Sequence, residues 1–304
     1  MSIYVVFKPS APVPLENVVL EYSDVERRPD FSKASKDAFD KVEAQVEEDI
    51  ASGKLVNRKN LHLDRFVCDG NKLVIVASYA RHASYVTYRN LLYKQAIPLQ
   101  PGFNLFSTII PTITNDGWQV FGFRTGNHLS GRYLSPAGFC DFDTSPCPNY
   151  FAVHTAEETR EELGVFRPGR SHFVGISFDD SHSFLSCAVV HTALVHSREY
   201  VERMWTASGN KEHDHLIYLK DDVAEFALFM CKKLEAIVNP EKEIFISNGK
   251  VNTSGSKKPI DYNLIDNGIS AWILDVFARH GAEKGSFLVK ELIASGNKII
   301  FGMP

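Results

Sequence analysis

The spacing of hydrophobic and polar residues predicts strands at the start of the chain, followed by one long helix. Residues 3–8 and 18–22 are short apolar stretches separated by a proline-containing turn, which is typical of strands. From Phe39 to Ile50 apolar residues recur at helical spacing, and this pattern predicts an amphipathic helix between residues 32 and 52. We expect this helix to cover one face of a sheet.

Further strands are predicted in pairs, because runs rich in β-branched and aromatic residues flank short turn sequences. Asn115-Asp-Gly117 is the strongest of these turn signals. We expect each pair to be joined by its own turn. The predicted pairs are 55–66 with 72–78, 103–114 with 118–125, and 172–178 with 183–194.

The order of strands and helices predicts the fold class. Strands precede and follow a helix at 150–163, and further helices come after them, which indicates an α/β fold with a mixed sheet between helices. We expect residues 1–100 to form an α+β region that packs on a core domain of residues 101–304. The other expected elements are a helix that begins at Ser197, a strand at 215–219, a helix from Asp221 or Asp222 to Ile237, and a helix at 265–278.

The predicted helix 150–163 carries the strongest candidate for chemistry. It places Glu158, Glu161 and Glu162 at positions i, i+3 and i+4, on one face of two adjacent turns. Carboxylates this close repel one another, and a hard divalent cation such as Mg²⁺ or Mn²⁺ would relieve the repulsion. A solvated acidic face is the alternative, because runs of charge usually face water.

The other side of this helix is expected to be buried. Val153, Ala156 and Leu163 fall together opposite the glutamates. Gly164 follows the last turn, and a glycine there favours the left-handed conformation that ends a helix.

The acidic helix resembles the catalytic core of the Nudix box, the signature of the Nudix hydrolases. The resemblance is carried by Glu-x-x-Glu-Glu-x-Gly-Val at 158–165, which follows a strand and the loop Pro136-Ala-Gly138. It implies an α/β/α sandwich and Mg²⁺-dependent cleavage of a nucleoside diphosphate linked to another group. It also implies that Glu158, Glu161 and Glu162 bind the metal ion.

The resemblance leaves the catalytic base open. Glu161 or Glu162 is implied by the box, and acidic neighbours would raise the proton affinity of either carboxylate. Glu212 and His213, in the polar loop 207–214, are chemically competent alternatives.

The match to the family pattern is incomplete. Counting back from Gly164, Glu157 stands where the family has an arginine, and Asn149 stands where it has a further glutamate. Arg160 is a possible replacement for the arginine. These departures favour a second reading, a catalytically impaired Nudix-fold protein that binds nucleotides, whereas the retained glutamates favour a hydrolase.

Within the superfamily the chain is similar to the UDP-glucose/UDP-galactose diphosphatases. Residues 84–91, Ser-Tyr-Val-Thr-Tyr-Arg-Asn-Leu, carry this likeness together with the long region before the box. It implies that Val56, Tyr88 and Arg89 bind the substrate, which would be split into UMP and a sugar 1-phosphate. Hydrolysis of another nucleoside diphosphate compound is the third reading.

Three substrate-binding candidates can also be argued from the residues alone. Tyr88 would stack on a base while Arg89 binds a phosphate, although packing at the surface explains the same pair. Arg124, at the end of a predicted strand, is placed to bind a diphosphate.

Composition restricts the partners and the cellular location. The chain has 304 residues, 44% of them hydrophobic, and a formal net charge of −4, which argues against nucleic acid as a partner. No apolar run is long enough for a membrane span, and the N-terminus does not resemble a signal peptide. Five dispersed cysteines are typical of reduced thiols, so we expect a cytoplasmic protein. The oligomeric state stays open.

Overall fold

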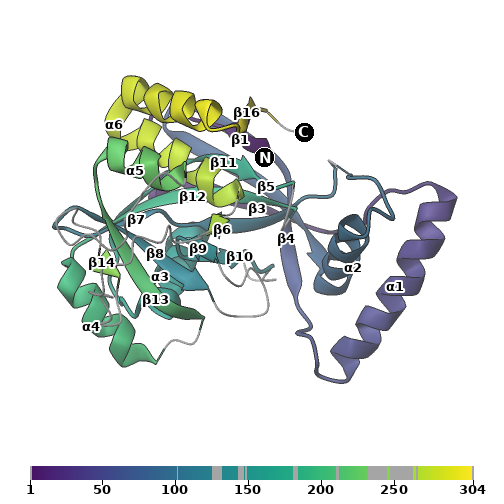
Figure 1. Ribbon diagram of the computed structural model, residues 1–304. Coiled ribbons are helices and arrows are strands. Elements are labelled where there is room, and N and C mark those ends of the chain that lie inside the picture. Colours follow the sequence, from purple (N-terminus) through teal and green to yellow (C-terminus); the bar gives the residue numbers. More distant parts are fainter. Residues whose placement is uncertain are drawn as a thin grey trace, which may run out of the picture.

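The strand from Leu185 to Leu194, β12, lies near the centre of the molecule (Figure 1). It pairs antiparallel with β11 and parallel with β6 and β7. Nearly all of its side chains are buried, because helices cover both faces of the sheet here. Its partners are β11 (Gly169–Phe178), β6 (Leu105–Ile109) and β7 (Thr112–Ile113).

A computed structural model of the protein describes residues 2–100, 102–124, 132–142, 147, 149–180, 184–209, 212–231, 245–246, 263–264 and 266–302. Strands of these residues form one sheet with parallel and antiparallel pairs, which confirms the expected α/β class. No helix in the described ranges is long and apolar enough to cross a lipid bilayer. The other strands are β1 (Ser2–Phe7), β2 (Val13–Pro14), β3 (Val18–Glu26), β4 (Lys59–Asp69), β5 (Lys72–Arg81), β8 (Trp118–Arg124), β9 (Arg132–Leu134), β10 (Ala137–Phe139), β13 (His213–Lys220), β14 (Phe245–Ile246), β15 (Asn263–Leu264) and β16 (Lys298–Phe301).

Helices lie on both sides of the sheet (Figure 1). Cys187 and Val189 of β12 pack with α5 and α6, whereas Ala188 and Val190 pack on the opposite side with α3. Successive side chains of a strand point to opposite faces, which explains this alternation. The helices are α1 (Lys33–Ala51), α2 (His82–Tyr93), α3 (Tyr150–Leu163), α4 (Arg198–Ser208), α5 (Val223–Met230) and α6 (Asp266–Ala294), with a short 3-10 helix η1 (Leu15–Asn17).

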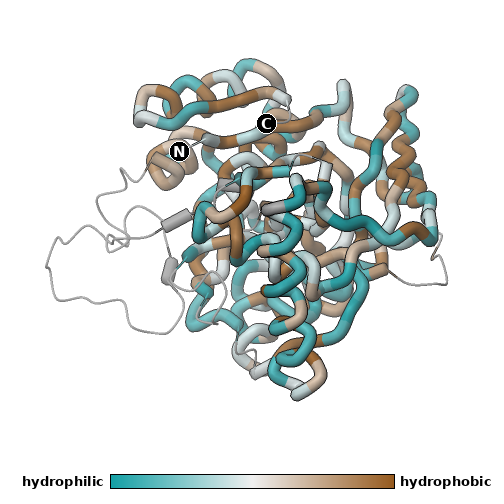
Figure 2. Tube along the Cα trace, turned by 90° about the vertical axis from the view of Figure 1, so that its right-hand side faces the viewer, coloured by the Kyte–Doolittle hydropathy of each residue, from teal (hydrophilic) through white to brown (hydrophobic). Residues whose placement is uncertain are grey.

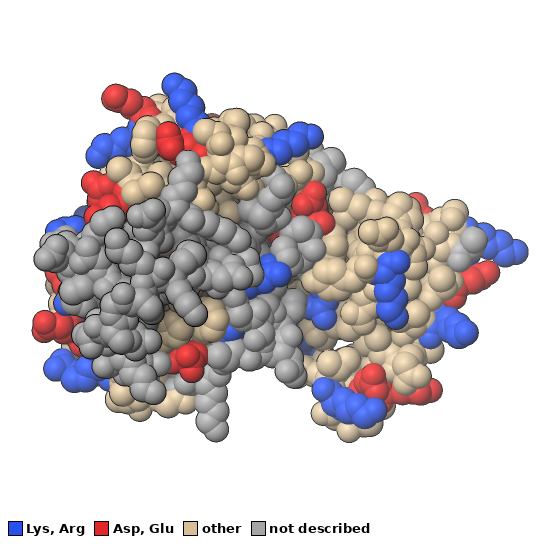
Figure 3. All heavy atoms as spheres, viewed as in Figure 1, with Lys and Arg blue, Asp and Glu red and all other residues tan. Residues whose placement is uncertain are grey.

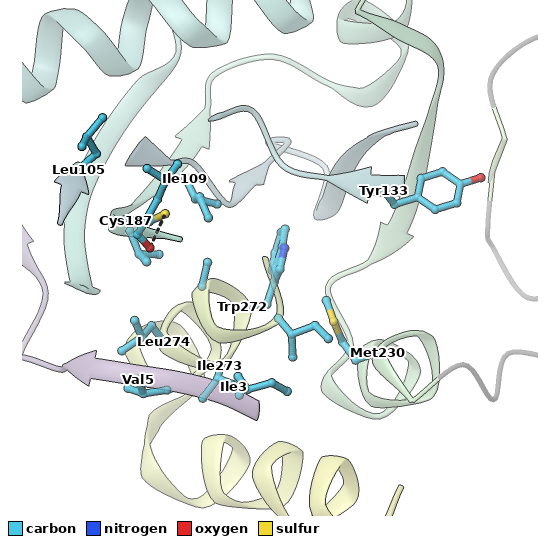
Figure 4. Close-up of a cluster of buried hydrophobic side chains, with 14 of the residues drawn as sticks. Ile3, Val5, Leu105, Ile109, Tyr133, Cys187, Met230, Trp272, Ile273 and Leu274 are labelled. Carbon is cyan, nitrogen blue, oxygen red and sulfur yellow. Dashed lines mark hydrogen bonds between the residues drawn. The ribbon is translucent and has the colours of Figure 1, made fainter. Parts of the chain in front are cut away.

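Trp272 anchors α6 to the sheet. It is almost fully buried, and its ring stacks on that of Phe121 of β8 with centroids 4.7 Å apart. Figure 4 shows it beside side chains of the sheet and Met230 of α5. Removing a buried tryptophan side chain costs about 3–5 kcal/mol of stability. The docking of α6 therefore depends strongly on this residue.

The first strand belongs to the same sheet as the C-terminal part of the chain. β1 pairs antiparallel with β11 and parallel with β16, so the two ends of the chain lie side by side (Figures 1 and 2). On the other side of the sheet, β4 meets β6 through the pair His62 and Leu105. Pairing is therefore continuous across residue 100, where we expected the N-terminal region to meet the core.

Local sequence signals located many of the elements correctly. The helix expected at 32–52 is α1, and β4 and β5 form the expected hairpin, with Gly70 at φ 60°. Ser197 caps α4 by accepting a hydrogen bond from the backbone of Tyr200, and Asp222 caps α5. These signals act over a few residues, so they do not depend on the rest of the fold.

Three expectations about the elements were wrong or incomplete. The strand expected at 103–114 is two strands, β6 and β7, and β7 alone pairs with β8. Pro111 interrupts the run, because proline cannot donate a backbone hydrogen bond. The last helix extends to Ala294 across a kink at Gly281, and the strand β16 was not predicted. The expected end of the helix that contains α5, at 232–237, lies outside the described residues.

Candidate functional site

A pocket of about 800 Å³ lies between α2, α3 and the strand β10. Pockets for small-molecule ligands commonly have this size. Its lining combines an apolar wall with many charged groups of both signs. On the face of the molecule shown in Figure 3, the acidic and basic side chains of the described residues are interspersed over the surface. The ionisable side chains that line the pocket include Arg58, His82, Arg89, Arg124, Asp141, Glu157, Glu158, Glu161 and Glu212.

The acidic helix ends as the sequence predicts. Gly164 has φ 70° and ψ 13°, the left-handed conformation, and its amide donates to the carbonyl oxygen of Arg160. A Cβ at Gly164 would also come within 2.6 Å of the carbonyl oxygen of Met204 in α4. Glycine is therefore required for both the turn and the close approach of α4.

The three glutamates of α3 lie in different environments. Glu161 is at the pocket rim with 62% of its side chain exposed, while Glu158 also lines the pocket and is 18% exposed. Glu162 is almost fully buried beneath them. The expectation that Val153 is buried was wrong, because this residue is 44% exposed and lines the pocket. Helix α3 is turned so that Glu162 shares the buried side with Leu163.

Glu158 is held in a crowded, poorly solvated position. Burial, then the negative charges of Glu161 and Glu212, raise the pKa of Glu158 to about 7, although Arg124 opposes this. His154 lies one turn earlier, with Nδ1 3.8 Å from Oε1 of Glu158. Burial lowers the pKa of His154 to about 4, so it is neutral at pH 7 and does not balance the carboxylate.

Glu162 is enclosed by the protein. The backbone amide of Ala137 donates to its Oε1 over 3.2 Å, and Nε2 of His213 lies 3.4 Å from its Oε2. Burial raises the pKa of Glu162 well above its ordinary value and lowers the pKa of His213 to about 4. Gly122 of β8 makes room for the histidine, since a Cβ there would lie 2.4 Å from the ring.

Arg124 and Glu212 form an ion pair at the pocket. Nη2 of Arg124 donates to Oε2 of Glu212 over 2.7 Å. The pairing of β8 with β13 produces this contact, because Arg124 is in register with His213, the residue after Glu212. Arg124 therefore places a positive charge near Glu158 and Glu162, and it lowers the pKa of both.

Two of the predicted substrate-binding residues line the pocket and two do not. Arg89 and Arg124 line it. Tyr88 is buried in the core, where its hydroxyl bonds to the backbone of Gln100, and Val56 is 65% exposed outside the lining. Adjacent residues of a helix point about 100° apart, so α2 directs Arg89 into the pocket and Tyr88 away from it.

Two further residues, Arg58 and His82, line the pocket and were not predicted from the sequence. The guanidinium of Arg58 lies over the ring of Phe139, 4.8 Å from its centroid. The backbone amide of His82 donates to the carbonyl oxygen of Arg58 over 2.9 Å, as an extension of the β4–β5 hairpin. No motif marks either residue. The register of the predicted hairpin was the one available signal that they meet.

The donor atoms suit a hard divalent cation. Glu158, Glu161 and Glu212 supply carboxylate oxygens inside the pocket, which are the ligands that Mg²⁺ and Mn²⁺ prefer. Gly138 leaves space for the Glu158 carboxylate that any side chain would fill. Among the described residues no three His, Cys, Asp or Glu side chains stand together in a geometry that could hold a metal ion. The chemistry of the site therefore fits the cation, and the carboxylates must move to coordinate it.

A scan of the chain against models of known protein families found no match, and neither did a search of curated proteins.

Proposed function

We propose that this protein is a Mg²⁺- or Mn²⁺-dependent hydrolase that cleaves the diphosphate of a nucleoside diphosphate compound. The observation that carries the proposal is the position of Glu158. It lines a pocket of about 800 Å³, where burial and then neighbouring carboxylates raise its pKa, and Arg124 lies close to it. A protein gains no stability from such repulsion, so the arrangement favours a site that receives a cation.

The glutamates of α3 would hold the metal ion. Glu158 and Glu161 line the pocket, whereas Glu162 is buried outside its lining, bonded to the amide of Ala137, and would have to turn into the pocket to join them. Bound Mg²⁺ would neutralise the diphosphate and lower the pKa of a water molecule. A carboxylate binds the cation in its deprotonated form, and the charge of Arg124, which lowers the pKa of Glu158 and of Glu162, favours that form.

Arginines would bind the phosphate groups of the substrate. Arg89 and Arg124 line the pocket, and one guanidinium group can donate two parallel hydrogen bonds to the oxygens of a phosphate. Arg124 would have to leave Glu212 or share its donors between that carboxylate and the phosphate. Released in this way, Glu212 would be able to accept a proton from the attacking water, as would Glu161 at the rim.

His213 does not suit the role of general base. It is fully buried next to Glu162 and does not line the pocket. Its contact with Glu162 supports a packing role beneath the site. Of these two alternatives, Glu212 is therefore the better candidate for the general base.

UDP-glucose and UDP-galactose are the substrates that we expect, with UMP and a sugar 1-phosphate as products. This narrower assignment depends on the resemblance of residues 84–91. The pocket has room for a nucleotide sugar, and its apolar wall includes Leu55, Val86 and Leu185.

The second candidate function is nucleotide binding without turnover. It is favoured by Glu157, which stands where the Nudix pattern has an arginine, and by the need for the carboxylates to move before they can bind a metal ion. Both functions use the same pocket. They differ only in whether the diphosphate is cleaved.

Turnover assays separate the two functions. The protein would be incubated with Mg²⁺ and a panel of nucleoside diphosphate sugars, and the nucleotide products separated by chromatography. Glu162→Gln should abolish cleavage and leave the melting temperature nearly unchanged, because glutamine still accepts the hydrogen bond of Ala137. Glu157→Gln at the pocket rim is the matched control. Binding without cleavage by the unaltered protein would support the second function, and full activity of Glu162→Gln would contradict the metal site.

A further inference from the structure

The part of the pocket around Arg58 and His82 differs in chemistry from the acidic part. Burial, and then the positive charges of Arg58 and Arg89, lower the pKa of His82 to about 4. His82 is therefore neutral at pH 7, between two permanent cations. One ring nitrogen of a neutral histidine carries a hydrogen and the other is an acceptor. The tautomer of His82 therefore decides whether this part of the pocket binds a hydrogen-bond donor or an acceptor of the ligand.

A chain of hydrogen bonds from Asp141 determines that tautomer. Nδ2 of Asn60 donates to Oδ1 of Asp141 over 3.0 Å, and a carboxylate can only accept. The other amide atom of Asn60, Oδ1, is therefore an acceptor, and it lies 3.1 Å from Nδ1 of His82. Nδ1 must carry the hydrogen in this contact. Nε2 is then an acceptor, and within the described part of the chain it has no partner.

Arg58 places hydrogen-bond donors beside this acceptor. Its guanidinium lies over the ring of Phe139, and Nη1 is 3.8 Å from Asp141, too far for a hydrogen bond. Its Nε is buried and has no hydrogen-bond partner among the described residues. The two terminal Nη groups, which make no hydrogen bond within the described residues, are therefore the donors that Arg58 offers to a ligand.

An acceptor at Nε2 of His82 beside the donors of Arg58 does not suit a phosphate group bound at His82. A phosphate oxygen would meet the lone pair of Nε2 and be repelled by it, although the neighbouring arginines would attract it. A planar group with both a ring N–H and a carbonyl oxygen would donate to Nε2 of His82 and accept from Arg58, so both residues would be hydrogen-bonded. Guanidinium planes also stack well on flat rings such as bases.

We infer that Nε2 of His82 accepts a hydrogen bond from the ring N–H of an oxo nucleobase, such as the imide of uracil, while Arg58 donates to the adjacent carbonyl oxygen. The inference rests on the proposed function, because it places a nucleoside diphosphate compound in this pocket. It assigns base specificity to residues 58 and 82, which the resemblance did not indicate.

Uridine and cytidine nucleotides give the sharpest test. They differ in that N3 of uracil carries a hydrogen, whereas N3 of cytosine is an acceptor and would face the lone pair of His82. One repelled and unsatisfied hydrogen bond commonly costs about tenfold or more in affinity. Calorimetric titration of the protein with UMP and with CMP, in buffer containing EDTA, measures this ratio without metal or turnover.

Two variants of His82 test whether this residue causes the difference in affinity between UMP and CMP. We expect the unaltered protein to bind UMP about tenfold or more tighter than CMP. His82→Phe keeps a ring but removes the acceptor, so the ratio should fall below about twofold, mainly through weaker UMP binding. His82→Gln should bind both nucleotides with a similarly small ratio, because an amide can present either a donor or an acceptor. His172→Phe, at a histidine of β11 outside the pocket lining, is the control and should keep the ratio.

Several results would overturn the inference. They are equal binding of UMP and CMP by the unaltered protein, no binding of UMP, or a preference that survives in His82→Gln. Pyrophosphate is a further probe, since loss of its binding in His82→Gln as large as that of UMP would indicate an anion site instead. Failure of hydrolysis with an intact UMP preference would refute the proposed reaction alone, so the two proposals fail separately.

Discussion

Gly138 lies so close to Glu158 that a Cβ on the glycine would come within 1.9 Å of Oε1 and 2.1 Å of Cδ of the carboxyl group. The strand β10 thus passes directly over the carboxylate that the pocket presents. The side-chain end of a glutamate is flexible, so a methyl group at residue 138 would displace it at little cost in stability. This contact makes the position of Glu158 testable without altering Glu158 itself.

Gly138→Ala should lower kcat/KM by about 100-fold, because a displacement of about 1 Å in a catalytic group can cost that much. The free energy of unfolding should fall by less than about 1 kcal/mol. Steady-state kinetics and urea denaturation check both values. Gly268→Ala is the matched control, because Gly268 also lines the pocket and a Cβ there meets nothing within 4 Å. Equal activity of the two variants would contradict the assigned position of Glu158.

Glu158 should make the metal-free protein lose stability, relative to the variant Glu158→Gln, as the pH rises from about 4.5 to about 7. The pKa of Glu158 is about 7 in the folded protein, compared with 4.5 for a glutamate free of these surroundings, as in the unfolded chain. Between these two pH values Glu158 binds more protons in the folded state than in the unfolded state, so its contribution to stability falls. Denaturation in EDTA at a series of pH values measures the slope. Mg²⁺ should reverse it above pH 7, since the cation binds the deprotonated carboxylate. The histidines with a lowered pKa contribute to both proteins alike, so the difference in free energy of unfolding between the unaltered protein and Glu158→Gln isolates the contribution of Glu158. Parallel curves for the two proteins would contradict the assignment.

Arg124→Gln should reduce kcat/KM by about 100-fold, because it removes a charge that would stabilise the departing phosphate. It should also shift the acidic limb of the pH–rate profile to higher pH. Arg124 lowers the pKa of Glu158 and Glu162, so both would hold their protons more tightly without it. Arg198→Gln is the control, because this arginine lies over Trp118, outside the pocket lining. A profile with an unchanged acidic limb would show that Arg124 does not influence the carboxylates.

Tyr88→Phe should cost about 1 kcal/mol of stability and leave KM unchanged, because the hydroxyl bonds to the backbone of Gln100 inside the core. Arg89→Gln should instead raise KM, since Arg89 lines the pocket. Thermal denaturation and substrate titration of the two variants compare adjacent residues of one helix. A raised KM in Tyr88→Phe would restore the role in binding that the sequence suggested.

Asp275→Asn should destabilise the protein by about 3–5 kcal/mol, the usual cost of breaking a buried ion pair. Asp275 is fully buried on α6, 2.7 Å from Nδ1 of His191 and 2.7 Å from Nη2 of Arg279. These partners overcome burial and lower its pKa to about 2, so the contribution is present above pH 4 and is lost as the pH falls toward 2. Acid denaturation of the two proteins should therefore differ most above pH 4. Asp222→Asn, which keeps a capping side chain on α5, is the control.

Features that depend on neighbours in the sequence were predictable, and features that depend on packing were not. Gly164 ends α3 as expected, because the left-handed turn is a property of that residue and its helix. Val153 was expected to be buried and is exposed, whereas Glu162 was expected on the opposite, metal-binding face and is buried. Helical spacing gives the angle between two residues and does not say which side of the helix meets the sheet. Tyr88 and Arg89 show the same limit on α2.

The amino-acid sequence by itself determined the acidic helix, its glycine cap, the hairpins and the α/β class, since each follows from propensities and hydrogen bonds within a few residues. Only the tertiary structure brought Gly138 over Glu158, placed Arg58 and His82 in one wall, and paired Arg124 with Glu212. These contacts join residues far apart in the chain. Strand register and helix docking decide them, through the burial of apolar surface across the whole sheet.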